Sequence, residues 1–302
     1  MKSIPATILI SLACLVAVLC AGCRRPLADG VSYSEGNVAL LRTALGGDKA
    51  AAATPVAMAE PTGWATLRGV FKLSGQAPPP TPIAVSSDFS VCMPGGKAPP
   101  GNDIVVDPSG GIANIFVYLE TKYPDGDPKW EHSDYAAAPK EVVFDQKVCV
   151  FLTHAFAMRT SQTLKVLNSD PTGHNTNLEG GGNARSENFA VPAGGSASYA
   201  PGGEADEPFK VRCNAHPWMA AYGIVRKSPY FDVTNAGGGF EIPNLPAGVP
   251  LRFRVWQERL RSIREVKVTG KIDKYNKGRM DLKLDTNEQR ELELVVDASL
   301  FK

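Results

Sequence analysis

The chain has 302 residues, of which 43% are hydrophobic and 21% are charged, and its formal net charge is +1. This composition allows a globular core of one or two domains, and the balanced charge argues against nucleic acid as a partner. The 24 prolines and 29 glycines leave few long helical patterns, which favours an all-β chain with many turns.

Residues 1–23 are predicted to be an export signal. Lys2 precedes the apolar run "ILISLACLVAVLCAG", which is shorter than the ~20 residues of a membrane span. Ala21 and Gly22 before Cys23 resemble a bacterial lipobox, in which the cysteine is acylated and becomes the mature N-terminus. An ordinary cleaved signal and an uncleaved anchor are the alternatives. In each case we expect export, to the periplasm or the outer cell envelope, and in the lipobox case we also expect lipid anchoring through Cys23.

The remaining cysteines predict one disulfide and one free thiol. Two of the six cysteines lie in the signal and a third is the predicted acylation site, which leaves Cys92, Cys149 and Cys213. An oxidising compartment favours pairing two of these. Cys92 and Cys149 are the predicted pair, because Cys213 lies in a loop rich in metal-ligand residue types.

After the signal, the chain reads as a tether followed by two series of strands. Residues 24–62 are rich in alanine and glycine and predict a flexible tether. From Gly63, "ATLRGVFKLSG", "DIVVDPSGGIANIFVYLE" and "TLKVLN" alternate as strands between Pro/Gly turns. A second series begins with "YFDVTNAGGGFEIPNLPAGVPLRFRVWQE". We therefore expect one sandwich in 63–226, with an N-terminal strand extension, and another in 227–302.

The segment "FKVRCNAHPWM" places three potential metal ligands at equal steps directly after a strand. They are Cys213, His216 and Met219. Thiolate, imidazole and thioether together suit copper, with methionine as a weak axial ligand. A second histidine, His174, follows the strand "TLKVLN" in "NSDPTGHNTN". The sequence therefore predicts one type 1 copper at a pole of the sandwich, where the two strand ends meet.

Other chemistries fit these residues less well. Zinc is the alternative metal, but its sites use Cys, His and carboxylates, and a thioether is not among them. Four histidines are too few for a multicopper oxidase, and no C-x-x-C-H haem site is present. A Cys213–His216 nucleophile would need a base-orienting partner, and no such pattern stands out. We expect no catalytic residues and no enzymatic activity.

Two families resemble this chain. "NSDPTGHNTN" with "CNAHPWM" resembles the cupredoxins, and the tight ligand loop is similar to that of their amicyanin-like, plastocyanin-like and pseudoazurin-like branches. "FEIPNLPAG" with "RVWQE" resembles the carboxypeptidase regulatory-like, or transthyretin-like, sandwich. Their combination resembles bacterial cell-envelope proteins called methylamine-utilisation-like, over about residues 63–270. The resemblance implies a Greek-key cupredoxin sandwich followed by a smaller β-sandwich.

The resemblance also implies roles for individual residues. It makes the four side chains named above the copper ligands, and it makes Asn175 the residue that ties the two ligand loops together. His154, in "LTHAF", matches a family position and is a possible accessory ligand; the alternative is a structural histidine. The family often has histidine where this chain has Ser228 and Gln257, so no second metal role is expected there.

The expected function is one-electron transfer at the cell envelope, in exchange with an unidentified redox partner protein. His216, flanked by Pro217 and Trp218, is expected to present its edge near the surface as the electron port. The alternatives are copper storage or delivery, and a non-redox structural binding module. Residues 251–283 hold eleven Lys/Arg and four acids. This pattern fits an acidic partner or anionic lipid, but solvated strand faces give it as well.

Overall fold

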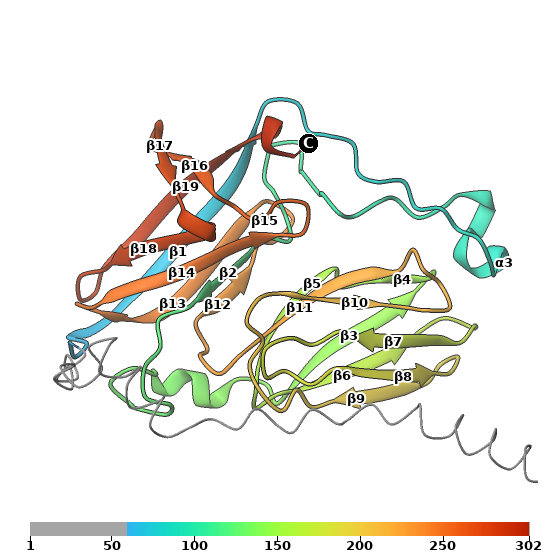
Figure 1. Cartoon of the computed structure of the whole chain (residues 1–302), viewed down its shortest axis with the longest axis horizontal. Helices are drawn as coiled ribbons and strands as arrows, with labels where there is room; N and C mark the ends of the chain where they lie inside the picture. Colours follow the sequence, from blue (N-terminus) through green and yellow to red (C-terminus); the bar gives the residue numbers. More distant parts are fainter. Residues whose placement is uncertain (1–58, 302) are drawn as a thin grey trace, which may run out of the picture. The chain divides into compact units, whose positions relative to one another are not determined.

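The structure is a computed structural model that describes residues 59–301. These residues form four β-sheets with only short helices between strands, so the predicted all-β class is confirmed (Figure 1). The predicted signal, the acylation site Cys23 and most of the tether lie outside the described residues. Within the described part, no helix is long and apolar enough to cross a membrane.

The first sandwich carries the candidate ligands. Its strands are β3 (Glu141–Lys147), β4 (Val150–Phe151), β5 (Ala155–Arg159), β6 (Thr163–Asn168), β7 (His174–Leu178), β8 (Glu187–Val191), β9 (Ser196–Tyr199), β10 (Phe209–Arg212) and β11 (Ala220–Arg226). One sheet has the order β4–β3–β6–β9 and the other the order β5–β11–β10–β7–β8. The pairs β3–β6 and β5–β11 are parallel, so the chain crosses between the sheets instead of forming a simple meander.

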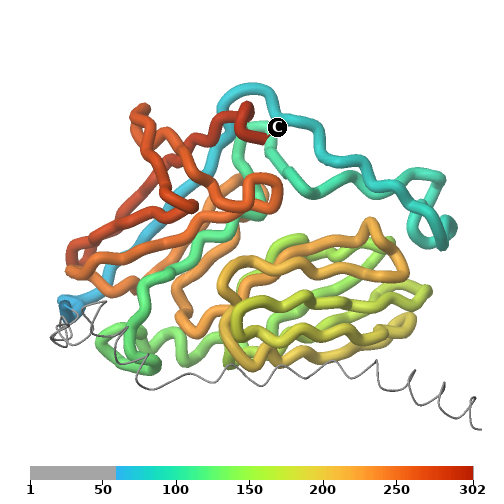
Figure 2. Tube along the Cα trace, in the orientation of Figure 1, coloured from blue at the N-terminus to red at the C-terminus, as the bar shows by residue number. Residues whose placement is uncertain are grey.

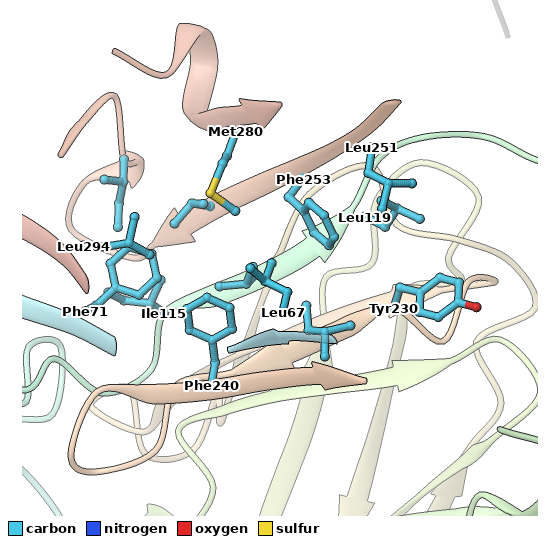
Figure 3. Close-up of a cluster of buried hydrophobic side chains, with 14 of the residues drawn as sticks. Leu67, Phe71, Ile115, Leu119, Tyr230, Phe240, Leu251, Phe253, Met280 and Leu294 are labelled. Carbon is cyan, nitrogen blue, oxygen red and sulfur yellow. The ribbon is translucent and has the colours of Figure 1, made fainter. Parts of the chain in front are cut away.

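The second sandwich is built mostly from the C-terminal part of the chain. Its strands are β1 (Gly63–Ser74), β2 (Phe116–Leu119), β12 (Phe231–Val233), β13 (Gly239–Ala247), β14 (Pro250–Gln257), β15 (Arg261–Ser262), β16 (Glu265–Val268), β17 (Lys271–Lys274), β18 (Arg279–Lys283) and β19 (Gln289–Asp297). The sheet orders are β13–β1–β19–β16–β17 and β12–β2–β14–β15, with β18 also paired to β14. Figure 3 shows inward side chains of both sheets meeting in one core, among them Phe71, Phe240, Phe253 and Leu294.

Strand pairing crosses the predicted division of the chain at residue 226. β1 pairs in parallel with β19 and antiparallel with β13, and β2 pairs with β12 and β14. The second sandwich therefore contains two strands from the N-terminal side of the division. The alternating pattern around Leu67 and Phe71, both fully buried, predicts a strand with one apolar face. That pattern does not specify which distant strand becomes the partner.

Strand β2 is buried on both faces. Val117 and Leu119 belong to the core of the second sandwich. Phe116 and Tyr118 point the other way, into the core of the first sandwich, where Trp256 of β14 joins them. A strand buried on both faces reads as a continuous apolar run, as "FVYL" does here. One strand of the second sandwich thus helps to build both cores.

The helical segments of the described residues are short; four lie in connections and the fifth follows the last strand. They are α3 (Phe89–Cys92), η2 (Pro94–Gly96), η3 (Ser133–Ala137), η4 (Asn276–Gly278) and η5 (Ala298–Leu300). Figure 2 shows the chain running out from β1 to α3 and returning towards β2. Asp88, at the start of α3, has a φ of 49°, a left-handed conformation that is uncommon for residues other than glycine.

The predicted disulfide between Cys92 and Cys149 is confirmed. It joins α3 to the turn between β3 and β4, and both of its cysteines are fully buried. Cys213 is the free cysteine of the described residues, as the count of cysteines predicts.

Replacing both Cys92 and Cys149 by alanine is expected to destabilise the protein. The bond closes a separation of 57 residues, so the loop-entropy model gives a loss of about 4 kcal/mol in the free energy of unfolding. Urea unfolding of the double variant beside the wild type measures this loss, with the wild type in a reducing agent as a second comparison. Equal midpoints for variant and wild type would contradict the expectation.

Candidate metal centre

Two strand ends bring the candidate ligands together. His174 is the first residue of β7, and Cys213 directly follows β10, which pairs antiparallel with β7. His216 and Met219 lie in the loop that leads into β11. The loop is closed by backbone hydrogen bonds, because Cys213 N–H donates to the carbonyl of Met219 and Met219 N–H donates to that of His216. The register of β7 and β10 therefore fixes the two segments against each other.

Three donor atoms converge in the interior. The Nδ1 atoms of His174 and His216 are 2.8 Å apart, and the Sγ atom of Cys213 lies 4.0 Å and 3.7 Å from them. All three side chains are buried. Met219 is 1% exposed and belongs to the same hydrophobic cluster as Cys213.

Two other groups of nearby donors contain Cys149, one of them together with Cys92. The sulfurs of Cys92 and Cys149 are bonded to each other and so cannot act as thiolate ligands.

Carboxylates hold the far nitrogen of both imidazoles. Nε2 of His174 lies 2.8 Å from Oδ2 of Asp170, and Nε2 of His216 lies 3.0 Å from Oδ2 of Asp88. The hydrogen bond with His216 lowers the pKa of Asp88, which keeps this group an acceptor. A carboxylate at Nε2 favours the tautomer that carries its proton there and leaves Nδ1 free as a ligand.

The two Nδ1 atoms therefore face each other with their lone pairs. Two acceptor atoms 2.8 Å apart repel unless a positive charge lies between them, and burial lowers the pKa of His174, which disfavours a proton there. The sulfur of Cys213 lies within 4.0 Å of both nitrogens. The side chains that are present thus fit a metal ion of the borderline or soft type, and copper matches a set of two imidazoles and one thiolate.

Asp170 is the more firmly placed of the two carboxylates. Its side chain is 3% exposed, and it accepts hydrogen bonds from the backbone N–H groups of Val148 and Cys149 at 2.6 Å and 2.8 Å. Its own N–H donates to Oδ1 of Asn168. Asp170 therefore connects His174 to the turn that carries the disulfide.

Neither carboxylate was assigned a role from the sequence. Asp170 lies four residues before His174, and this short spacing could have indicated a carboxylate partner for that histidine. Asp88 is 128 residues from His216, and no local pattern connects the two.

The expected surface position of His216 is wrong. Its side chain is only 2% exposed, because Asp88 and the residues around α3 cover the Nε2 edge. Pro217, the next residue, is exposed in the structure as the sequence suggests. The sequence cannot show, however, that a distant segment folds over the imidazole ring of His216.

Asn175 links the two ligand segments by hydrogen bonds. Its Oδ1 atom accepts from the backbone N–H groups of Asn214 and Ala215, at 2.7 Å and 3.2 Å. The thiol of Cys213 lies 3.3 Å from the same oxygen. This geometry is the one expected of a residue that ties the loops together.

His154 lies outside this group of donors. It is 9% exposed, and its Nε2 atom contacts the carboxylate of Glu258. Its Nδ1 atom is buried without a hydrogen-bond partner among the described residues. The structure therefore does not bring His154 together with Cys213 and the other two histidines.

The metal-free protein is expected to lose stability in mild acid. Burial lowers the pKa of His174 below its ordinary value of 6.5. When the pH falls below about 6.5, the unfolded chain takes up a proton that the folded state refuses, so the free energy of unfolding falls until the lowered pKa is reached. Urea midpoints at about pH 7.5 and about pH 5.5 measure this change. His174→Phe should flatten the difference, and an unchanged slope would contradict the assignment.

Comparison with known proteins gives only weak structural matches. No family model matches it, and no curated protein matches it. Among solved structures, a copper-containing nitrite reductase from Thermus scotoductus SA-01 is 13% identical with a TM-score of 0.27. That match covers 29% of this chain and only 23% of the reductase.

Two amicyanin mutants in the copper(I) form are also similar. They are 15% and 13% identical, each with a TM-score of 0.25, and each match covers 36% of this chain and 98% of amicyanin. Because these scores are low, we base the function of the centre on its own geometry.

Proposed function

We propose that this chain is an exported, cupredoxin-like copper protein that carries single electrons at the cell envelope. One type 1 copper would be held by His174, Cys213 and His216, with Met219 as the weak axial ligand. The convergence of three buried donor atoms, with both Nε2 atoms turned to carboxylates, is the main support. Bound copper would supply a group that gains and loses one electron without any bond to a substrate.

The surrounding residues would keep the ligands in place in both oxidation states. Asp170 and Asp88 fix the orientation of the two imidazoles, and Asn175 holds the backbone beside Cys213. Ligands that do not have to move leave little reorganisation to accompany electron transfer. Burial of Cys213 and Met219 keeps water and substrates away, which favours a carrier over an enzyme.

Copper reconstitution of the purified full chain tests this proposal. We expect one copper per chain, intense visible absorption from thiolate-to-copper charge transfer, and a reversible reduction potential. Binding without a reversible potential would instead indicate storage or delivery. Failure to bind any metal tightly would leave a structural envelope module and overturn the proposal.

Met219→Leu is expected to raise the reduction potential while copper is retained. The weak axial ligand tunes the potential of such centres, and leucine removes the thioether at similar volume. Met158→Leu is the matched control, because Met158 is fully buried in β5 and lies outside the ligand loop. A fall, or an equal potential in both variants, would count against the axial role.

We further propose export, which the disulfide supports, and lipid anchoring through Cys23. The pair Cys92–Cys149 suits an oxidising compartment outside the cytoplasm. Mass spectrometry of the mature N-terminus tests acylation of Cys23, with Cys23→Ser as the control. We further propose that the C-terminal, carboxypeptidase regulatory-like sandwich orients the copper domain towards an unidentified redox partner protein.

A further inference from the structure

The imidazole edge of His216 is closed to an incoming redox partner. Nε2 is 3.0 Å from the carboxylate of Asp88, and the side chain is 2% exposed. The covering segment is tied down by the disulfide of Cys92 and by a hydrogen bond from Thr172 to Asp88. Asp88 keeps a left-handed φ of 49° at this position. Backbone strain of this kind persists only where surrounding contacts hold it.

Trp218 is a second aromatic residue through which an electron could reach the centre. Its indole packs against the ring of His216, with centroids 5.1 Å apart and planes at 64°. Its Nε1–H donates to the carbonyl of Cys149 at 3.1 Å, which fixes the ring. Trp218 is only partly buried, whereas His216 is covered. The indole is thus an aromatic contact between a ligand and the outside.

Beside Trp218 lies an open cavity of about 460 Å³. Its lining includes Pro217 and Trp218 of the ligand loop, Ala220 at the start of β11, and Ile83 of the segment between β1 and α3. Trp218, two residues after the covered His216, therefore lines a cavity that is large enough for a small molecule or a side chain.

We propose that electrons enter and leave the centre through the indole of Trp218, at this cavity, and not through the edge of His216. The inference rests on the proposed copper function. In the step, the reduced centre loses one electron and a one-electron acceptor gains it; no bond forms or breaks. The partner would be a redox protein that places its own redox group or a side chain in the cavity against Trp218.

Stopped-flow oxidation of the reduced full chain by hexacyanoferrate(III) tests the route. Trp218→Leu is expected to slow the reaction about tenfold, equivalent to about 1.4 kcal/mol of barrier, whereas Trp218→Phe keeps an aromatic ring and most of the rate. Trp64→Leu is the control, since Trp64 lies in β1, contacts His132 and is not in the ligand loop. Equal visible spectra and reduction potentials in these variants would show that the centre itself is unchanged.

Asp88→Ala separates the two routes. If Trp218 is the port, Asp88→Ala opens an alternative edge and restores the rate lost in Trp218→Leu, with the variants compared at equal copper content and reduction potential because Asp88 also orients His216. If His216 is the port, Trp218→Leu is oxidised at nearly the wild-type rate, and Asp88→Ala as a single substitution is oxidised faster than the wild type. That pair of results overturns the inference. A wild type without the copper–thiolate spectrum would instead overturn the proposed function.

A readout without copper completes the test. The fluorescence lost in Trp218→Phe reports the indole alone, and acrylamide should quench that component in the metal-free protein. Copper(II) should quench it on binding, because His216 and Trp218 are in contact. An indole that acrylamide does not reach would contradict access through the cavity.

Discussion

Cys213→Ser is expected to abolish the visible absorption of the copper-loaded protein. In the proposed centre this band would arise from charge transfer between thiolate and copper, and Cys213 carries the free thiol of the described residues. A serine hydroxyl is a far weaker ligand for a soft metal, so copper affinity should fall as well. Titration with copper, followed by absorption and by metal analysis after gel filtration, measures both effects.

The fold should survive this change. A hydroxyl is smaller than a thiol by less than a methyl group, and Oδ1 of Asn175 lies within reach as an acceptor, so the free energy of unfolding of the metal-free protein should change by only about 1–2 kcal/mol. Asn214→Ala is the control, because Asn214 is exposed and directly follows the thiol. An intact absorption band in Cys213→Ser would remove the basis of the proposed function.

Asp170→Ala is expected to lower the free energy of unfolding by about 3 kcal/mol, because it leaves buried N–H groups without an acceptor. These are the N–H groups of Val148 and Cys149, which both have positive φ, at 54° and 51°. A β-branched residue is rarely found in that conformation, and the carboxylate stabilises the turn that contains it.

The same substitution should weaken copper binding by about 10–100-fold, since loss of a partner at the far nitrogen of a ligating histidine usually has such an effect. Asp125→Ala is the matched control, because Asp125 forms an exposed ion pair with Lys227 and should contribute less than about 1 kcal/mol. Urea unfolding and copper titration of both variants decide the matter. Similar losses in Asp170→Ala and Asp125→Ala would refute the structural role of Asp170.

Local sequence patterns were sufficient for the type of element and for the donor residues. Alternation along "TLKVLN" predicted a strand, and the structure gives its burial as strictly alternating in β6. The spacing of Cys213, His216 and Met219 follows from a tight turn after a strand, and the distant His174 was found because it also follows one. Three cysteines remain after the signal, and an oxidising compartment favours pairing two of them; because Cys213 lies in the ligand loop, this was enough to predict the disulfide.

Contacts between distant segments could not be predicted in this way. β1 pairs with β19 more than two hundred residues later, and alternation specifies a buried face but no partner. Asp88 reaches His216 only because the segment around α3 folds across the ligand loop. For the same reason the sequence suggested an exposed imidazole edge where the structure has a covered one.

The double-sided burial of β2 means that the half with the candidate ligands cannot be excised by cutting after Arg226. Such a fragment would lack Trp256 and would leave Phe116 and Tyr118 without the strands that shield them. In the intact chain, heating should therefore melt both halves in a single calorimetric peak. A cation that tightens the ligand loop should also protect the distant C-terminal strands from proteases.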